Sequence, residues 1–217
     1  PAVHFLLTDR LTCPRCGPGF GLILLAQKLQ DRVVHEGRLG CANCRDAYPV
    51  EGGFGDLRAP PRGPLPPGLA GLPGSVPVGA PDPGAECARL LALLGIMGGP
   101  GTIALVGEPS RVAAPMARAL PEMHVVAIDP DQRDWPESPG VSRLASAPGL
   151  PFHDSGLRGV AVDGRLGASW VGEAARVVAP RARVVLARAP AGGGAWLEVA
   201  GLRVIASDPE TIVAARS

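Results

Sequence analysis

Four cysteines, arranged as two Cys-x-x-Cys pairs, are the residues of this chain best suited to chemistry. Cys13 and Cys16 lie in the stretch LTCPRCG, and Cys41 and Cys44 lie in LGCANCRDAYPV. One further cysteine, Cys87, lies elsewhere in the chain. Two such pairs can form two disulfides, serve as a redox motif or supply four ligands to one metal ion. Because these uses differ in the oxidation state of sulfur, the compartment of the protein bears on the choice.

The N-terminal residues and the apolar runs predict a cytoplasmic protein. The stretch PAVHFLLTDRL lacks the basic flank and long apolar run of a secretory signal. No run of about 18 apolar residues is free of charges or helix breakers, so no membrane span is expected. Thiols in the cytoplasm stay reduced.

Under reducing conditions the two pairs predict one structural zinc ion per chain, held by Cys13, Cys16, Cys41 and Cys44. Zinc prefers four ligands in a tetrahedron, and two residues between cysteines allow a tight turn to aim both sulfurs at one point. Gly17 can adopt the left-handed conformation that closes such a turn. Four thiolates leave no open position for water, so the site is structural rather than catalytic. The alternatives are two disulfides or a thioredoxin-type centre, although neither pair opens an obvious helix of a βαβ unit.

The segment between the two pairs predicts a small β-domain. The apolar run at 20–26 is short and bounded by glycine, which favours a strand. The stretch RVVHEGRLGC at 32–41 predicts a second strand, with a turn around Glu36 and Gly37. So short a domain buries little apolar surface, and zinc must therefore supply part of its folding energy.

The same segment resembles the Trm112-like zinc-ribbon family over residues 3–58. The specific part is the second cysteine pair followed by Tyr-Pro-Val and then by an acidic residue with glycine, as in LGCANCRDAYPVEGG. Domains of that family resemble the small activating partner of several methyltransferases, and bacterial versions can be fused to a methyltransferase or encoded beside one. The resemblance implies a protein partner or self-association through the ribbon.

Residues 59–84 predict a Pro/Gly-rich linker between a ribbon at 1–58 and a second domain at 85–217. In the surrounding stretch at 55–84, GDLRAPPRGPLPPGLAGLPGSVPVGAPDPG, proline or glycine stands at about every second position. The apolar residues there do not recur with the spacing of a helix or a strand. Such a composition favours an extended, polyproline-like conformation. The alternative is an ordered strap laid across the second domain, which the leucines and valines of the segment permit.

Residues 85–217 alternate between helical and strand patterns. Strands are expected at 101–107, 124–130, 140–146, 157–164 and 181–189, helices at 85–98, 110–121 and 169–180, and a closing antiparallel pair at 202–207 and 211–217. Pro115 is expected to break or kink the middle of its helix, and the run AGGGA at 191–195 predicts a flexible connection. The alternation predicts an α/β fold with a Rossmann-like, mostly parallel sheet covered on both faces.

The second domain resembles a class I S-adenosylmethionine-dependent methyltransferase. VVAIDPD at 125–131, GLPFHDSGLRGVAVDGRL at 149–166 and EAARVVAPRARVVLARAP at 173–190 match that family in order. The resemblance implies S-adenosylmethionine as a cofactor, with Gly107 and Asp129 as cofactor-binding residues beyond the carboxyl ends of the strands. A carboxylate at the position of Asp129 can accept hydrogen bonds from ribose hydroxyls.

The expected cofactor loop, ALVGEPSRVA, departs from the family pattern. Leu105 stands where an acidic residue is expected, and Pro109 and Arg111 take the positions of the second and third glycines. Those glycines let the backbone approach the cofactor closely, whereas proline removes a donor and fixes φ. Glu108 adds negative charge near the place of the cofactor carboxylate, and Ser146 stands where an adenine-binding acid is common.

We therefore expect a methyltransferase-like fold with a weakened cofactor site that acts as a non-catalytic binding or assembly module. Methyl transfer depends mainly on holding cofactor and nucleophile in line, so a loop that cannot cradle the cofactor removes the main contribution. The alternative is an active S-adenosylmethionine-dependent methyltransferase with an atypical loop, and no catalytic residue is predicted. The net charge of +1, the dispersed arginines and the scarcity of aromatic residues disfavour nucleic acid as a strong direct ligand.

Overall fold

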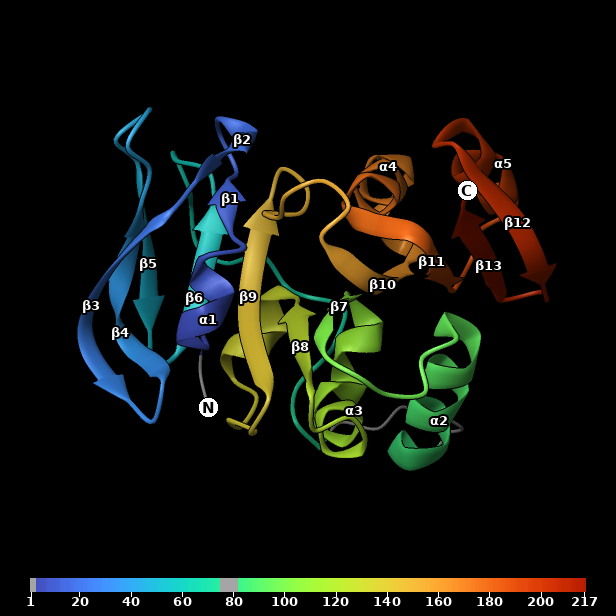
Figure 1. Ribbon diagram of the computed structural model, residues 1–217, viewed down its shortest axis with the longest axis horizontal. Coiled ribbons are helices and arrows are strands. Elements are labelled where there is room, and N and C mark those ends of the chain that lie inside the picture. The colour runs from blue at the N-terminus through green and yellow to red at the C-terminus, as the bar shows by residue number, and fades with distance from the viewer. Residues whose placement is uncertain (1–2, 75–81) are drawn as a thin grey trace.

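The computed structural model describes residues 3–74 and 82–217, which form one long 11-stranded sheet with helices on both faces and a separate two-stranded sheet of β1 and β2 (Figure 1). The strands are β1 (Thr12–Cys13), β2 (Gly17–Gly21), β3 (Ile23–Gln30), β4 (Val33–Gly40), β5 (Ala47–Glu51), β6 (Phe54–Arg58), β7 (Gly101–Val106), β8 (Met123–Ile128), β9 (Val141–Ala147), β10 (Leu157–Asp163), β11 (Val178–Ala187), β12 (Leu202–Ser207) and β13 (Thr211–Arg216). The α-helices are α1 (Phe5–Thr8), α2 (Pro83–Leu94), α3 (Ala113–Ala119), α4 (Ala168–Val177) and α5 (Gly193–Val199), and the 3₁₀ segments are η1 (Glu108–Val112), η2 (Pro130–Arg133) and η3 (Gly164–Leu166). Within this described part, no helix is long and apolar enough to cross a membrane.

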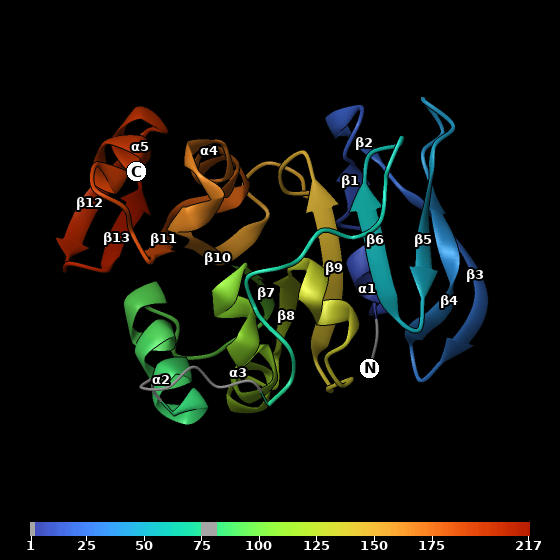
Figure 2. The same ribbon diagram turned by 180° about the vertical axis from the view of Figure 1, so that it is seen from behind.

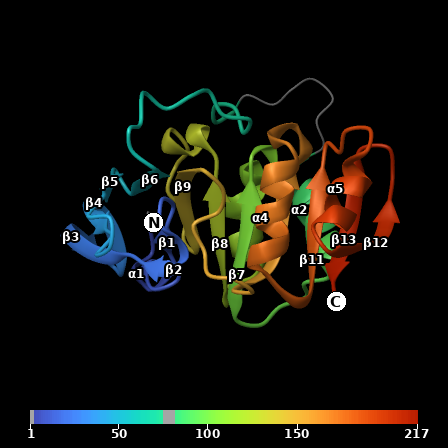
Figure 3. The ribbon, with the colours of Figure 1, turned by 90° about the horizontal axis from the view of Figure 1, so that it is seen from above.

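The centre of the sheet is parallel. The strand order is β12-β13-β11-β10-β7-β8-β9-β6-β5-β4-β3, and the run from β11 to β6 is parallel throughout. α2 and α3 cover one face and α4 and α5 cover the other (Figure 3). Alternate residues of β7 therefore enter two cores: Ile103 and Leu105 pack with α2 and α3, whereas Ala104 and Val106 pack with α4. The predicted Rossmann-like, mostly parallel α/β sheet is confirmed.

The N-terminal strands extend this same sheet. β6 pairs in parallel with β9, with Gly55 opposite Leu144. A Cβ atom on Gly55 would lie 2.8 Å from Leu144 Cδ2, so glycine permits the close contact there. The Arg143 guanidinium also crosses the seam and donates a hydrogen bond to the Gly52 carbonyl at 2.9 Å. Backbone and side-chain bonds thus both join the ribbon strands to the parallel sheet.

The N-terminal hairpin turns at a different place from the one predicted. β4 runs unbroken through Glu36 and Gly37, so the turn expected there is wrong. The chain reverses instead at Asp31 and Arg32, which have φ of 50° and 63°. Gly37 meets a packing requirement inside the strand, since a Cβ atom there would lie 2.7 Å from the Leu25 carbonyl oxygen.

Two expectations about the helices are also corrected. Pro115 lies in the first turn of α3 rather than in the middle of a longer helix, because η1 precedes α3. An N–H in the first turn has no intrahelical acceptor, so proline costs little at that position. The run AGGGA is not wholly a flexible connection, because α5 begins at Gly193 inside it.

Residues 59–74, called the strap below, lie ordered against the parallel sheet. Figure 2 shows the strap leave β6 and pass β9 and β8 toward α3. Ala70 is fully buried, and the Trp135 indole N–H donates to the Gly71 carbonyl at 2.8 Å. Arg58 donates to the carbonyls of Gly63 and Pro64 at 2.9 and 3.0 Å. Of the two conformations that the sequence left open, the ordered strap describes residues 59–74, while 75–81 of the predicted linker lie outside the described residues.

Candidate functional site

The four predicted metal ligands converge on one point. Their sulfur atoms all lie within 4.8 Å of one another, with 3.7 Å between Cys13 and Cys44 and 3.8 Å between Cys16 and Cys41. Zinc–sulfur bonds of about 2.3 Å in a tetrahedron place neighbouring sulfurs about 3.8 Å apart, whereas a disulfide needs about 2.05 Å. All four are free cysteines. Their donor type and spacing therefore fit one tetrahedral metal ion and differ from those of two disulfides.

The turns around the cysteines supply groups that stabilise thiolates. Gly17 has φ of 90°, as the left-handed prediction requires. The Tyr48 hydroxyl lies 3.2 Å from Cys13 Sγ, and the Asn43 amide donates to Cys16 Sγ at 3.2 Å. Burial opposes ionisation of Cys13, but the hydrogen bonds from Tyr48 and from the Cys16 N–H lower the pKa of this thiol to about 7. Sequence reasoning treated Tyr48 as part of a motif and missed this contact.

The two predicted cofactor-binding residues lie side by side at the carboxyl ends of β7 and β8. Gly107 follows β7, and its N–H donates to the Ile128 carbonyl at 2.9 Å; Asp129 follows β8 directly. Gly107 has φ of 75°, and a Cβ atom on it would lie 2.7 Å from Asp163 Cβ. The close approach of Asp163 is sufficient by itself to require glycine here.

The strap fills the space in front of Asp129. The Leu69 N–H donates to Asp129 Oδ2 at 2.8 Å. The N–H groups of Gly68 and Gly71 donate to the two carboxylate oxygens of Asp131 at 2.9 and 2.6 Å. A Cβ atom on Gly68 would lie 1.9 Å from Asp129 Oδ1, so the strap backbone rests directly against this carboxylate. Burial raises the pKa of Asp129, although backbone N–H groups that bind the carboxylate oppose the rise.

The loop after β7 is held by ion pairs and hydrogen bonds. Glu108 opens η1 and pairs with Arg188 at 3.2 Å, while its backbone N–H donates to Asp163 Oδ2 at 3.3 Å. Asp163 is fully buried and pairs with Arg165 at 2.6 Å. Each of these two carboxylates at the ends of β7 and β10 is thus neutralised by an arginine of the same chain.

The other departures from the family pattern also have structural partners. Leu105 is fully buried in the core beneath α2 and α3. Pro109 is buried in the first turn of η1, where its missing N–H costs little. The Ser146 hydroxyl donates to the Gly149 carbonyl at 2.8 Å and thereby shapes the turn after β9. These residues stabilise the fold at the places where the resemblance predicted contacts with a cofactor.

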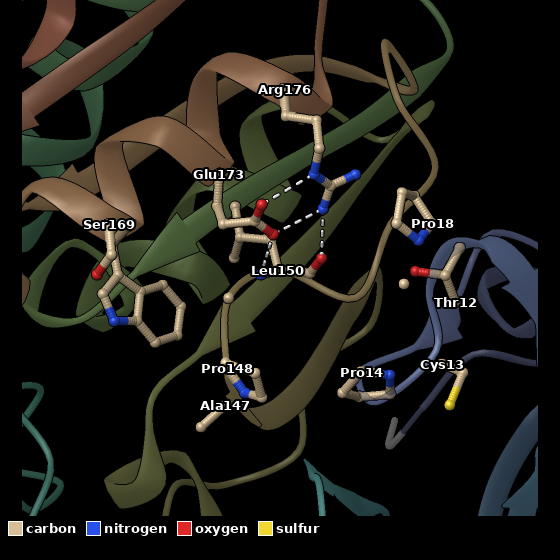
Figure 4. Close-up of a pocket in the computed structure, with 13 residues that line it drawn as sticks. Thr12, Cys13, Pro14, Pro18, Ala147, Pro148, Leu150, Ser169, Glu173 and Arg176 are labelled. Atoms are coloured by element: carbon tan, nitrogen blue, oxygen red, sulfur yellow. Dashed lines mark hydrogen bonds and ion pairs between the residues drawn. The ribbon is translucent and has the colours of Figure 1, made fainter. Parts of the chain in front are cut away.

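A cavity of about 520 Å³ separates the first cysteine pair from α4 (Figure 4). Three prolines and Trp170 line it together with the pair formed by Glu173 and Arg176. Arg176 donates to both carboxylate oxygens of Glu173, at 2.9 and 2.7 Å, and the Leu150 N–H donates to one of them at 3.0 Å. Burial by itself would raise the pKa of Glu173, but these hydrogen bonds hold it below its ordinary value. The Glu173 carboxylate in the cavity wall is therefore ionised, and its oxygens already accept hydrogen bonds from Arg176 and Leu150.

Comparison with known proteins adds little to this geometry. No family model matches the chain, and no curated protein matches it. The pyocyanin biosynthetic protein PhzM is a structural neighbour at 17% identity and a TM-score of 0.44, over 62% of this chain and 54% of PhzM, so the chain spans about half the length of that protein. A chain from the complex of the Haloferax volcanii Trm112 methyltransferase activator with a methyltransferase matches at 16% identity and a TM-score of 0.46, over 58% of this chain and 77% of that one. Precorrin-6y C5,15-methyltransferase from Geobacter metallireducens GS-15 matches at 15% identity and a TM-score of 0.44, over 61% and 88% of the two chains. Likeness of this degree says nothing about activity.

Proposed function

We propose that this protein is a zinc-containing, methyltransferase-like binding module whose nucleotide site is closed by its own strap. The observation that carries the proposal is the hydrogen bond from the Leu69 N–H to Asp129 at 2.8 Å. A bound S-adenosylmethionine would need this carboxylate for its ribose hydroxyls. Here the Asp129 carboxylate instead accepts a hydrogen bond from the strap, which belongs to the same chain. Such an intramolecular ligand has a high effective concentration and is hard to displace.

The loop after β7 supports the same proposal. Glu108 and Pro109 stand where a glycine-rich loop would let the backbone approach the cofactor, and Glu108 is bound to Arg188 at 3.2 Å. Entry of the methionine part of the cofactor would have to break this ion pair and the hydrogen bond between the Glu108 N–H and Asp163. A shift of this loop would also disturb η1, in which Ser110 and Val112 are buried.

The ribbon supplies the assembly function in this proposal. The division expected from the sequence is kept: a Trm112-like ribbon at 1–58 with one zinc on its four cysteines, a linking segment at 59–84 and a methyltransferase-like domain at 85–217. β3 is the outer strand of the sheet and pairs only with β4 among the described strands. Its side chains Ile23, Leu25 and Leu29 are exposed. An open strand edge beside apolar side chains suits a protein partner or a second copy of the chain.

Calorimetric titration with S-adenosylmethionine tests the closed site. We expect no binding by the wild-type protein up to about 1 mM ligand, a limit that corresponds to about 4 kcal/mol of binding free energy. Micromolar binding by the wild-type protein would contradict the proposal and support the alternative, an active S-adenosylmethionine-dependent methyltransferase.

A pair of strap variants locates the cause. Gly68→Val places side-chain atoms where Asp129 Oδ1 lies and should push the strap away, whereas Gly63→Val is the matched control because a Cβ atom there meets nothing within 4 Å. If Gly68→Val binds S-adenosylmethionine and Gly63→Val does not, the strap is what closes the site in the wild-type protein. If neither variant binds, the loop with Pro109 and Arg111 accounts for the loss.

A further inference from the structure

A second cavity lies at the opposite edge of the sheet, where the parallel strands begin. It has a volume of about 450 Å³ and lies between α1, the β3–β4 turn and the first residues of β7 and β8. Four basic residues line it, namely His4, Arg10, Arg32 and His124. This cavity shares no residue with the cysteine cluster or with the strap site, so the inference below does not depend on the proposed function.

The two arginines of this cavity carry uncompensated charge. Neither the Arg10 nor the Arg32 side chain has a hydrogen-bond or ion-pair partner within residues 3–74 and 82–217. Both arginines are solvent-exposed and line the cavity. Glu122 is the acidic residue in the lining, and it too has no ion-pair partner among the described residues. The cavity therefore holds two positive charges against one negative charge.

The two histidines offer hydrogen-bond donors to the same space. His4 Nδ1 accepts from the Leu6 N–H at 3.2 Å, so the neutral ring carries its proton on Nε2. Ser142 Oγ accepts from the His4 backbone N–H at 2.9 Å and lies 2.8 Å from His124 Nε2. The hydroxyl can donate to His124 Nε2, in which case the His124 proton lies on Nδ1 and faces away from Ser142. Both remaining ring N–H groups lack partners in the described part of the chain.

Burial and the neighbouring positive charges both keep the two histidines neutral. Burial lowers the pKa of His124 to about 4, and the charges of His4 and Arg10 add to the effect. Burial likewise lowers the pKa of His4, with Arg32 as the second cause. The rings lie with their centroids 5.3 Å apart. A free imidazole N–H that lies beside two guanidinium groups can donate a hydrogen bond to an anion in the cavity.

We propose that this cavity is a binding site for a phosphate-type anion, held by the guanidinium groups of Arg10 and Arg32 and by the imidazole N–H groups of His4 and His124. Guanidinium groups match the oxygen geometry of phosphate, and charge-assisted hydrogen bonds of this kind are the strong ones. The volume exceeds that of an inorganic phosphate ion, so the site also has room for a small phosphomonoester. Because the lining residues come from α1, the β3–β4 turn, β7 and β8, a bound anion also links the ribbon segment to the parallel sheet.

Titration calorimetry at low ionic strength with inorganic phosphate, and separately with phenyl phosphate, tests the proposal. We expect a dissociation constant below about 1 mM for at least one of them, and the tighter ligand identifies the source of the phosphate group as the free ion or a monoester. Arg10→Gln and Arg32→Gln should each weaken binding about tenfold. Arg38→Gln is the matched control, because Arg38 is exposed on β4 and outside the cavity. Absence of phosphate binding by the wild-type protein would contradict the proposed anion site, and so would an equal loss of affinity in all three variants.

Proton NMR of the wild-type protein gives an independent readout that needs no variant. Saturating phosphate should raise the pKa of His124 and of His4, because a nearby anion favours the imidazolium form. His153 lies outside the cavity and serves as the internal reference. Ring signals of His4 and His124 that stay unchanged while calorimetry detects binding would place the anion elsewhere and contradict the proposal.

Discussion

The backbone N–H of Leu69 lies 2.8 Å from Asp129 Oδ2, and this bond joins the Pro-rich strap to the residue at the carboxyl end of β8. The two residues are 60 positions apart in the chain. The contact is one of several hydrogen bonds that hold residues 59–74 in place despite their Pro/Gly-rich composition. Because the strap backbone occupies the space in front of Asp129, this buried carboxylate at the end of β8 stabilises the fold.

Loss of one metal ligand should unfold the ribbon. Cys13→Ser removes one of four sulfurs in a cluster whose members lie within 4.8 Å, and the energy of metal binding is part of the folding energy of so small a unit. We expect about one zinc per wild-type chain by metal analysis and less than half of that in the variant, with a lower thermal midpoint. Cys87→Ala is the control, because Cys87 lies on the buried face of α2, in a different core from the cluster, and should leave the zinc content unchanged. Full zinc content in Cys13→Ser would refute the four-sulfur site.

Tyr48→Phe should weaken the cluster without changing its ligands. The Tyr48 hydroxyl lies 3.2 Å from Cys13 Sγ and is the larger of the side-chain contacts that lower the pKa of this thiol. Removal of one hydrogen bond to a charged sulfur should cost about 1.5–3 kcal/mol. Faster release of zinc to a chelator and a lower urea midpoint would show the effect. An unchanged release rate would mean that the hydroxyl stabilises only the metal-free state.

Stability should fall as the pH is lowered from 7 to 5 because of His124. Burial lowers the pKa of this imidazole from its ordinary 6.5 to about 4. Between these two values the unfolded chain binds a proton that the folded chain does not, so acid favours unfolding. The linkage amounts to about 2 kcal/mol between pH 7 and pH 5. Arg10 and His4 add to the effect, while Arg32 and Glu122 also border the cavity.

Urea denaturation at the two pH values measures this loss. His124→Gln keeps an acceptor for the Ser142 hydroxyl, which lies 2.8 Å from the ring, and should remove most of the difference. Phosphate in the buffer should reduce the difference in the wild-type protein, because the proposed anion stabilises the protonated ring. A wild-type stability that is constant from pH 7 to pH 5 would contradict the burial of a neutral imidazole.

Glu173→Gln should destabilise the turn after β9. The Glu173 carboxylate accepts hydrogen bonds from Arg176 at 2.9 and 2.7 Å and from the Leu150 N–H at 3.0 Å, and loss of its charge leaves Arg176 half-buried with a weaker partner. We expect a loss of about 2–3 kcal/mol in the free energy of unfolding. Asp154→Asn removes a second, largely exposed partner of Arg176 and should cost less than about 1 kcal/mol. Equal effects of the two variants would show that burial of the carboxylate does not matter.

Local patterns in the sequence are sufficient to predict the metal ligands and most strands and helices of the parallel sheet. Cysteine spacing constrains short turns, so Cys13, Cys16, Cys41 and Cys44 could be grouped without knowing the fold, and the structure brings their sulfurs together. Buried strands of a parallel sheet are continuous apolar runs, which is why β7, β8 and β10 were visible. Glycine is ambiguous in a sequence, because a turn and a close approach both require it: Gly37 suggests a turn but lies inside β4.

The sequence by itself determined which residues could hold a metal and which segments would form the strands of a parallel sheet. The metal ligands follow from the short spacing within each cysteine pair, and the strands follow from the pattern of apolar residues. Only the tertiary structure decided that β6 pairs with β9, that the strap backbone rests on Asp129 and that four basic residues face one cavity. These are contacts between segments far apart in the chain, and a backbone N–H in a Pro-rich run carries no side-chain signature of the carboxylate that it will meet.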